Sequence, residues 1–288
     1  MFLLNSFKFY CYKKRITFKE VYELWSKDYF EKIEASTQRT WIAAFKHSHV
    51  LHDMRINEIK VRDLEDAIRA EEVGDATKVR MKCLFNVLYK YAIKHELVNK
   101  NVAVYCDTPS WKKEIERLPF SRDEIEKLWN NLDKPFVDMI LAGIYLGFRP
   151  SELVGIKVSD VNLEDGFIRG GLKTKAGRNR FVPIHDDVLG IIKARVAQAD
   201  EYLFVKESGE HMNYFEYRRR FNKVMKRLNM HHFPHDTRHT FITLAKECDV
   251  NEYVLKLIVG HAVQDITEGV YTHRNREDFY REICKIKV

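Results

Sequence analysis

Two helix-start signals of the same kind divide the chain into two parts. Thr17 is followed three positions later by Glu20, and Ser121 by Glu124, in each case just before apolar residues at helical spacing. In this pattern, the capping box, the hydroxyl and the carboxylate each accept a backbone N–H of the helix start. Because 288 residues provide enough chain for two domains of ordinary size, we expect one domain to open at each signal.

The first part has the periodicity of an all-helical bundle. Apolar residues recur at helical spacing over about 36–50, 61–72 and 76–97. The periodicity then stops, and charged residues gather around Pro109, which is typical of a linker. The expected organisation is a short N-terminal arm (1–16), a helical domain (17–105), a linker (106–118) and a second domain (119–288).

The second part combines helices with a small sheet. An apolar helix ends at Gly147, and Pro150 opens the next one. Residues from Ile156 onward alternate, with turn residues at Asp165 and Gly166. The fold class expected is therefore mainly α with a small antiparallel β-sheet. The segments assigned to the sheet are 156–171 and 180–184, and those assigned to later helices are 186–198, 213–229 and 251–259.

Composition adds weaker constraints. The net charge of +7 and a pI near 9.0 are compatible with a polyanionic partner. Five cysteines without paired spacing predict neither a zinc knuckle nor a disulfide frame. No apolar run approaches the length of a membrane span. We expect a soluble cytoplasmic protein with no membrane partner.

The chemistry concentrates where a proline opens an apolar helix. His235 and Arg238 follow Pro234 and stand three positions apart, so both side chains leave the same face of the first turn. A proton-transfer group beside a fixed cation at a helix start suits a phosphate. Arg149 occupies another special position, because it lies in the tight turn between two helices.

These residues belong to a series of motifs that resembles a known family. The order is Arg149 to Glu152, a lysine hairpin ending at Pro183, His235 to Thr240, Gly260-His261, and Tyr271 to His273. It is similar to the order in the tyrosine recombinases of the phage integrase family, in particular the mobile-element integrases. The resemblance implies an α-helical core-binding domain and a mixed catalytic domain that clamp duplex DNA, with a C-terminal tail used for oligomerisation.

The resemblance also implies a role for each site residue. Tyr271 would attack the scissile phosphate and leave a 3′-phosphotyrosyl link, so that strand exchange needs neither a metal nor another cofactor. The other roles carried over are the two phosphate-binding arginines (Arg149, Arg238), the acid/base (His235), the hydrogen-bond donor to phosphate (His261), the lysine that protonates the leaving 5′-oxygen (Lys173) and two supporting residues (Glu152, Lys175).

Some of these assignments remain open. Either Lys173 or Lys175 could be the catalytic lysine, because both lie in the same turn. Tyr253 and Tyr280 compete with Tyr271 as nucleophile. Two departures from the family pattern concern spacing and packing. Thr237 stands where leucine is usual, and ten positions separate His261 from the Tyr271 nucleophile, one more than is commonest.

Other functions are possible on the same residues. His235 and His239 have the spacing of a helical zinc pair, with Asp236 in place of the usual glutamate, and His211, His231 or Glu247 as a third ligand would give a zinc hydrolase. A catalytically silent DNA-binding regulator is a second alternative. Within the family, a Xer-like resolvase or invertase is the alternative to an integrase.

The expected partners follow from the family. They are double-stranded DNA recombination sites, further copies of the chain in a tetramer, and accessory DNA-bending or excision factors. The C-terminal residues Phe279, Tyr280, Ile283 and Ile286 form an apolar stripe at helical spacing. We expect this stripe to dock on a neighbouring copy.

Overall fold

The protein, described here from a computed structural model, folds into two compact units, Met1–Glu114 and Ile115–Val288. The structure describes residues 15–109, 118–171, 179–261 and 276–287. The boundary between the units falls within the segment 106–118 that the sequence predicts as a linker. None of the described helices combines the length and the apolar character that crossing a membrane requires.

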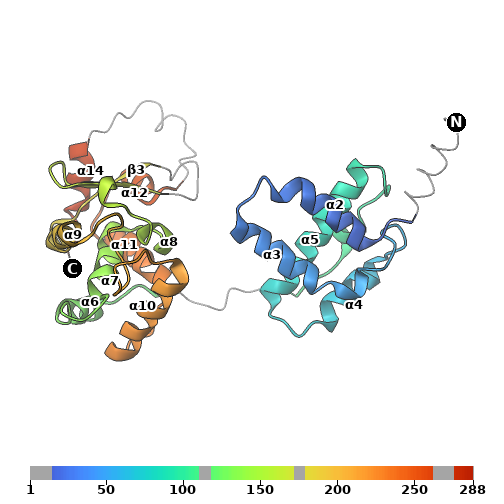
Figure 1. Cartoon of the computed structure of the whole chain (residues 1–288), viewed down its shortest axis with the longest axis horizontal. Coiled ribbons are helices and arrows are strands. Elements are labelled where there is room, and N and C mark those ends of the chain that lie inside the picture. Colours follow the sequence, from blue (N-terminus) through green and yellow to red (C-terminus); the bar gives the residue numbers. More distant parts are fainter. Residues whose placement is uncertain (1–14, 110–117, 172–178, 262–275, 288) are drawn as a thin grey trace. The chain divides into compact units, whose positions relative to one another are not determined.

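The first unit is a helical bundle (Figure 1). The predicted capping box opens it: the Thr17 hydroxyl accepts the Glu20 N–H at 3.2 Å, and the Glu20 carboxylate accepts the Thr17 N–H at 2.8 Å. Its helices are α2 (Phe18–Phe30), α3 (Ala35–Lys46), α4 (Val61–Ala70) and α5 (Asp75–Lys94), and its 3₁₀ turns are η1 (His49–Leu51) and η2 (Val102–Tyr105).

Helix α5 forms the centre of this bundle, because α2, α3 and α4 all pack against it. Its buried residues Met81, Leu84 and Leu88 recur at the predicted spacing. The helix predicted over 36–50 is shorter than expected, since α3 ends at Lys46. The Ser48 hydroxyl donates to the Ala44 carbonyl at 2.8 Å, and this local bond competes with continued helix.

The second unit is mainly α with one small sheet, which confirms the predicted fold class. Its sheet has the order β1-β2-β3, all antiparallel, with Ile168 opposite Val182. Its helices are α6 (Arg122–Trp129), α7 (Val137–Leu146), α8 (Pro150–Leu153), α9 (Asp186–Gln198), α10 (Tyr214–Leu228), α11 (Pro234–Glu247), α12 (Glu252–Val259) and α14 (Arg276–Ile283), and its strands are β1 (Val161–Asn162), β2 (Phe167–Gly170) and β3 (Arg180–Pro183), with η3 (Val158–Asp160) before β1.

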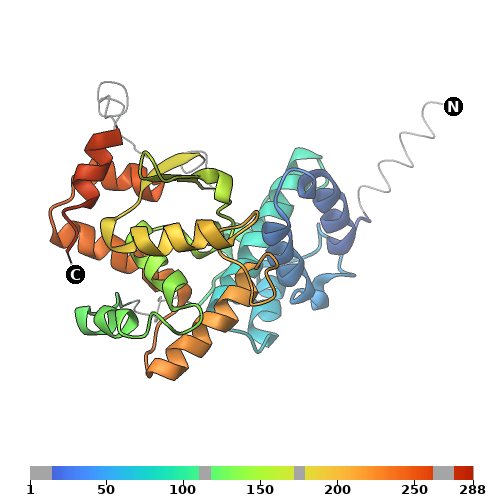
Figure 2. The ribbon, with the colours of Figure 1, turned by 60° about the vertical axis from the view of Figure 1, so that its left-hand side comes forward.

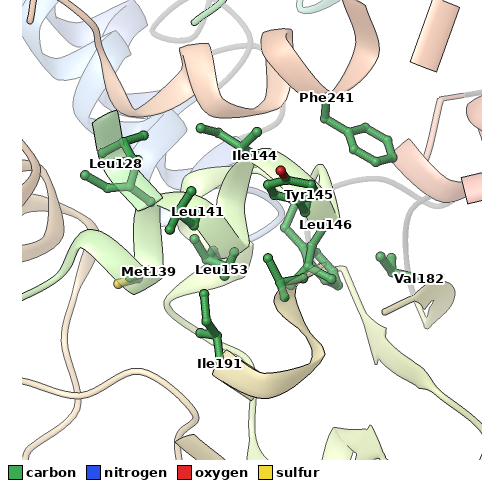
Figure 3. Close-up of a cluster of buried hydrophobic side chains, with 14 of the residues drawn as sticks. Leu128, Met139, Leu141, Ile144, Tyr145, Leu146, Leu153, Val182, Ile191 and Phe241 are labelled. Carbon is green, nitrogen blue, oxygen red and sulfur yellow. The ribbon is translucent and has the colours of Figure 1, made fainter. Parts of the chain in front are cut away.

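Helix α7 is the scaffold of this unit, because almost all of it is buried and α6, α9 and α11 pack on it. Figure 3 shows Ile144 and Leu146 of α7 with Leu153 of α8 and Phe241 of α11. At Gly143 a Cβ atom would lie 3.1 Å from the Thr237 hydroxyl oxygen, so α11 approaches α7 closely. Packing on α7 therefore fixes where α8 and α11 begin.

The C-terminal helix packs within the second unit. Helix α14 packs against β3 and α12 of the same chain (Figures 1 and 2), and the docking of its stripe on a second copy stays a prediction. Ile283 and Ile286 are 0% and 2% exposed and belong to the core of the unit. His185 donates from Nε2 to the Ile286 carbonyl at 2.9 Å. An apolar stripe shows that a face must be covered, but not what covers it.

Replacing Gly147 by alanine should destabilise the second unit. Gly147 ends α7 with φ +65°, and a Cβ atom there would lie 2.4 Å from Cδ1 of Phe241. We expect a loss of about 2 to 4 kcal/mol in the free energy of unfolding from strain and overpacking. Gly190→Ala is the matched control, because a Cβ atom at that helical position meets nothing within 4 Å. Urea unfolding followed by circular dichroism compares the two, and equal midpoints would contradict the expectation.

Candidate active site

Arg149 lies in the turn between α7 and α8, as the sequence predicts. Gly147 ends α7 in the left-handed region, and Pro150 opens α8. Glu152, in the first turn of α8, accepts the Arg149 N–H at 3.0 Å through Oε2 and its Nη1 at 3.0 Å through Oε1. The Arg149 side chain remains 18% exposed. The turn therefore presents a guanidinium whose direction is set by a carboxylate three residues away.

The Glu152 carboxylate is shared by two arginines. It is 3% exposed, and its Oε2 also accepts a hydrogen bond from Arg180 Nη2 at 2.8 Å. Burial raises the pKa of this carboxyl, but the hydrogen bond and charge of Arg180, together with Arg149, outweigh burial and bring the pKa to about 2. Glu152 is therefore ionised at any physiological pH.

Arg238 is held by the ends of two other helices. Its side chain extends from the first turn of α11, where Asp236 caps the Phe233 N–H at 2.7 Å. Its Nη1 donates to the Gly147 carbonyl at 2.9 Å, and its Nη2 donates to the Val259 carbonyl at 2.6 Å. These carbonyls lie at the C-terminal ends of α7 and α12, where the helix dipole favours a cation. Burial, followed by the charges of Arg149 and Arg180, lowers the pKa of Arg238 to about 10.

His261 lies directly beside Arg238. It follows Gly260, which ends α12 with φ +69°. Arg238 Nη2 and His261 Nε2 are 3.1 Å apart. Burial lowers the pKa of this imidazole, and the charges of Arg238, Arg149 and Arg180 lower it further. Because Arg238 can only donate, Nε2 accepts and the proton of the neutral ring is on Nδ1.

The structure thus brings together four of the predicted site residues: Arg149, Glu152, Arg238 and His261. It adds Arg180, which sequence analysis assigned to a strand without a role. Arg180 alternates with Phe181 and shares its face of β3 with the fully buried Val182. That period-two pattern was the signal available in the sequence, since a charged residue at an inward position needs a partner.

The remaining predicted residues are only partly described. His235 is half-buried at the second position of α11, one turn before Arg238. Lys173, Lys175 and Tyr271 lie outside the described residues. In the sequence, both lysines fall between β2 and β3, and the tyrosine falls between α12 and α14.

The two rival tyrosines have other surroundings. The Tyr280 hydroxyl lies 2.5 Å from Oδ1 of Asp186, and this hydrogen bond is the main cause that raises its pKa far above the ordinary value. Tyr253 is 8% exposed and packs within the second unit. Both arrangements disfavour attack by these hydroxyls on a DNA phosphate.

The zinc alternative gains no support from the described part of the chain, where no three metal-ligating side chains come together. The ring of His211 lies against that of Tyr202, with centroids 4.1 Å apart and planes tilted by 42°, and His211 pairs with Val205 in an isolated β-bridge. Asp236 uses its carboxylate to cap α11. His235 and His239 therefore have no third ligand among these residues.

Comparison with known proteins assigns the family. The sequence pattern of the phage integrase family matches residues 120–278, and that of the N-terminal SAM-like domain of phage integrases matches residues 17–70. Tyrosine recombinase XerA of Saccharolobus solfataricus is 28% identical over 229 residues, which are 77% of this chain and 73% of that protein. A tyrosine recombinase of Agathobacter rectalis is 34% identical over 151 residues, 49% of this chain and 47% of that protein.

Solved structures show the same fold. The Tn1549 transposon integrase in complex with circular intermediate DNA has a TM-score of 0.72 at 19% identity, over 93% of this chain and 99% of that one. A lambda integrase dimer bound to a COC′ core site has a TM-score of 0.73 at 17% identity, over 86% of this chain and 96% of that one. With the family pattern spanning more than half of the sequence, the chain belongs to the phage integrase family and is a tyrosine site-specific recombinase.

Proposed function

We propose that the cluster around Arg149 and Arg238 binds the scissile phosphate of a DNA recombination site. The observation that carries this is the charge balance of the described residues. The guanidinium groups of Arg149 and Arg180 are close enough to Arg238 to help lower its pKa, and Glu152 is the carboxylate that pairs with Arg149 and Arg180. An excess of fixed positive charge in a partly buried site suits a phosphodiester, and forked cations suit its non-bridging oxygens.

His261 is suited to the same anion. As a neutral ring that accepts from Arg238, it has its Nδ1–H free of that bond, and the residue is exposed. A hydrogen bond from Nδ1 to a non-bridging oxygen would strengthen as negative charge grows in the pentacoordinate transition state.

The remaining steps are assigned to residues carried over from the family pattern. The Tyr271 oxygen forms a bond to phosphorus, the bond from phosphorus to the 5′-oxygen breaks, and a 3′-phosphotyrosyl link results. His235 accepts the phenol proton as acid/base, and Lys173 gives a proton to the departing 5′-oxygen, with Lys175 as the alternative donor. Reversal on a second strand rejoins the DNA without ATP, because the phosphotyrosyl link conserves the energy of the bond.

The biological role that we propose is integration or excision of a mobile element. The fold shared with integrases of a transposon and of phage lambda supports it. The sequence similarity to Xer recombinases supports resolution or inversion as the alternative. In this proposal, residues 17–105 bind the DNA core and residues 119–288 perform the chemistry, in a cytoplasmic protein.

Assembly on DNA is part of the same proposal. A lambda integrase of similar fold was solved as a tetramer bound to a Holliday junction, which supports a tetramer on two sites here. Accessory DNA-bending or excision factors would then choose the direction of the reaction.

The proposed nucleophile can be tested by covalent trapping. The full chain is incubated with nicked duplexes that carry the junction sequences flanking its coding element, with EDTA present, and run on a denaturing gel. We expect a slower protein band that survives SDS and is absent in Tyr271→Phe, because phenylalanine has no oxygen to bond phosphorus.

The other outcomes separate the alternatives. A band that persists in Tyr271→Phe would show that another residue is the nucleophile. Bound duplex without any covalent band would favour the silent regulator, and activity that depends on added zinc would favour the hydrolase.

Arg149→Lys should slow cleavage much more than it weakens DNA binding. Lysine keeps the charge but loses the fork that holds two phosphate oxygens, so we expect the single-turnover rate to fall about 100-fold or more. Arg195→Lys is the control, because Arg195 pairs with Asp138 at 2.5 Å and joins α9 to α7. A matched fall in both variants would contradict a phosphate-binding role for Arg149.

Glu152→Gln should destabilise the protein in a pH-dependent way. Its folded-state pKa of about 2 lies below the ordinary 4.5. The stabilisation from the carboxylate is therefore fully present above pH 4.5 and is lost as the pH falls toward 2. At neutral pH we expect the glutamine variant to lose about 3 to 5 kcal/mol, since the buried Arg180 and the partly buried Arg149 lose their counter-charge. Urea unfolding at several pH values measures this difference, and a gap that stays constant with pH would contradict it.

A further inference from the structure

Arg180 is almost fully buried, which is unusual for an arginine. Its side chain is 4% exposed at the start of β3. Nε donates to the Ile258 carbonyl at 2.7 Å, and Nη2 donates to Glu152 Oε2 at 2.8 Å. Its guanidinium lies 4.8 Å from the centre of the Phe148 ring. Burying such a group is costly, and these contacts offset that cost.

Each contact leads to a different part of the phosphate site. Glu152 sets the direction of Arg149. Ile258 is in the last turn of α12, which is followed by His261. Phe148 directly precedes Arg149, and strand β2 presses on its ring, because a Cβ atom at Gly170 would lie 2.8 Å from it.

We infer that Arg180 is a positioning residue of the recombinase site, which fixes Arg149 through Glu152 and His261 through the last turn of α12. This inference rests on the proposed function, since it assumes that Arg149 and His261 hold the scissile phosphate. Because one rigid planar group forms both bonds, α8 and α12 keep a defined separation. A shift of either element by about 1 Å would misplace a donor and slow the reaction.

The charge of Arg180 predicts an effect on the pH dependence of cleavage, which a purely structural residue would not have. Among the described residues, the charged or titratable groups that face Glu152 are Arg149 in the turn before α8 and Arg180 on β3, and those next in the cluster are Arg238 on α11 and His261 after α12. Arg180 is the strongest influence that lowers the pKa of Glu152. Without Arg180, only Arg149 opposes the effect of burial, so the pKa of Glu152 rises and the carboxyl takes up a proton at a higher pH than in the wild type. The protonated carboxyl no longer holds Arg149 as an ion pair.

The test uses the full chain and the nicked duplexes of the trapping assay. We compare Arg180→Met and Arg180→Lys with the control Arg195→Met. Arg195 has the same kinds of contact, a carboxylate of Asp138 at 2.5 Å and a ring of Phe204 at 5.7 Å, but it joins α9 to α7. DNA affinity and the single-turnover cleavage rate are measured for each variant between about pH 5 and about pH 8.

We expect Arg180→Met to bind DNA like the wild type and to cleave it at least about 30-fold more slowly. Its rate should also fall further as the pH is lowered, with a steeper acidic limb than in the wild type. Arg195→Met should cleave at nearly the wild-type rate with an unchanged profile. If Arg180 acts through Glu152, Glu152→Gln should slow cleavage much less in the Arg180→Met background than in the wild type.

The outcomes separate this inference from the proposed function. If the wild type forms no covalent product, the proposed function fails. If the wild type reacts but the Arg180 variants match Arg195→Met in rate and pH profile, the positioning role is overturned. If Arg180→Met does not fold, Arg180→Lys provides the same readouts, because it keeps the charge without the fork.

Discussion

The active site depends on one buried carboxylate. Guanidinium groups repel one another, and burial strengthens that repulsion because the surroundings screen charge poorly. Glu152 makes their approach possible by accepting hydrogen bonds from both Arg149 and Arg180. The same bonds join the short helix α8 to strand β3, so the group that balances the charge also holds the backbone in place. A positive excess remains for an anionic ligand.

The apolar scaffold performs the complementary task. Helix α7 is surrounded by other elements, and the small residues along it allow α11 to lie close. This contact places the guanidinium of Arg238 where the carbonyl ends of α7 and α12 point toward it. Carbonyl groups at helix C-termini have no partner within the helix, and Arg238 donates hydrogen bonds to such carbonyls at the ends of both α7 and α12. Hydrophobic packing and the ion cluster are thus consequences of the same arrangement.

The site also explains why its charged residues differ in accessibility. Arg180 and Arg238 are almost fully enclosed, whereas Arg149 and His261 remain partly open to solvent. Groups that bind a ligand must be reachable, and groups that hold them must be rigid. Arg180, which is bonded to Glu152 and to the Ile258 carbonyl, belongs to the rigid part of the site.

The sequence by itself determined the local features, which depend only on residues close together in the chain. Capping boxes, the helices over 186–198 and 251–259, the turn that presents Arg149 and the helix start that presents Arg238 all follow from short-range backbone chemistry. Tertiary structure decided the rest. Arg180 gains its role from partners on α8 and α12, Ile283 and Ile286 pack on their own chain, and Tyr280 is bound to Asp186. Such contacts join residues far apart in the chain, and local periodicity cannot specify which distant surface a residue meets.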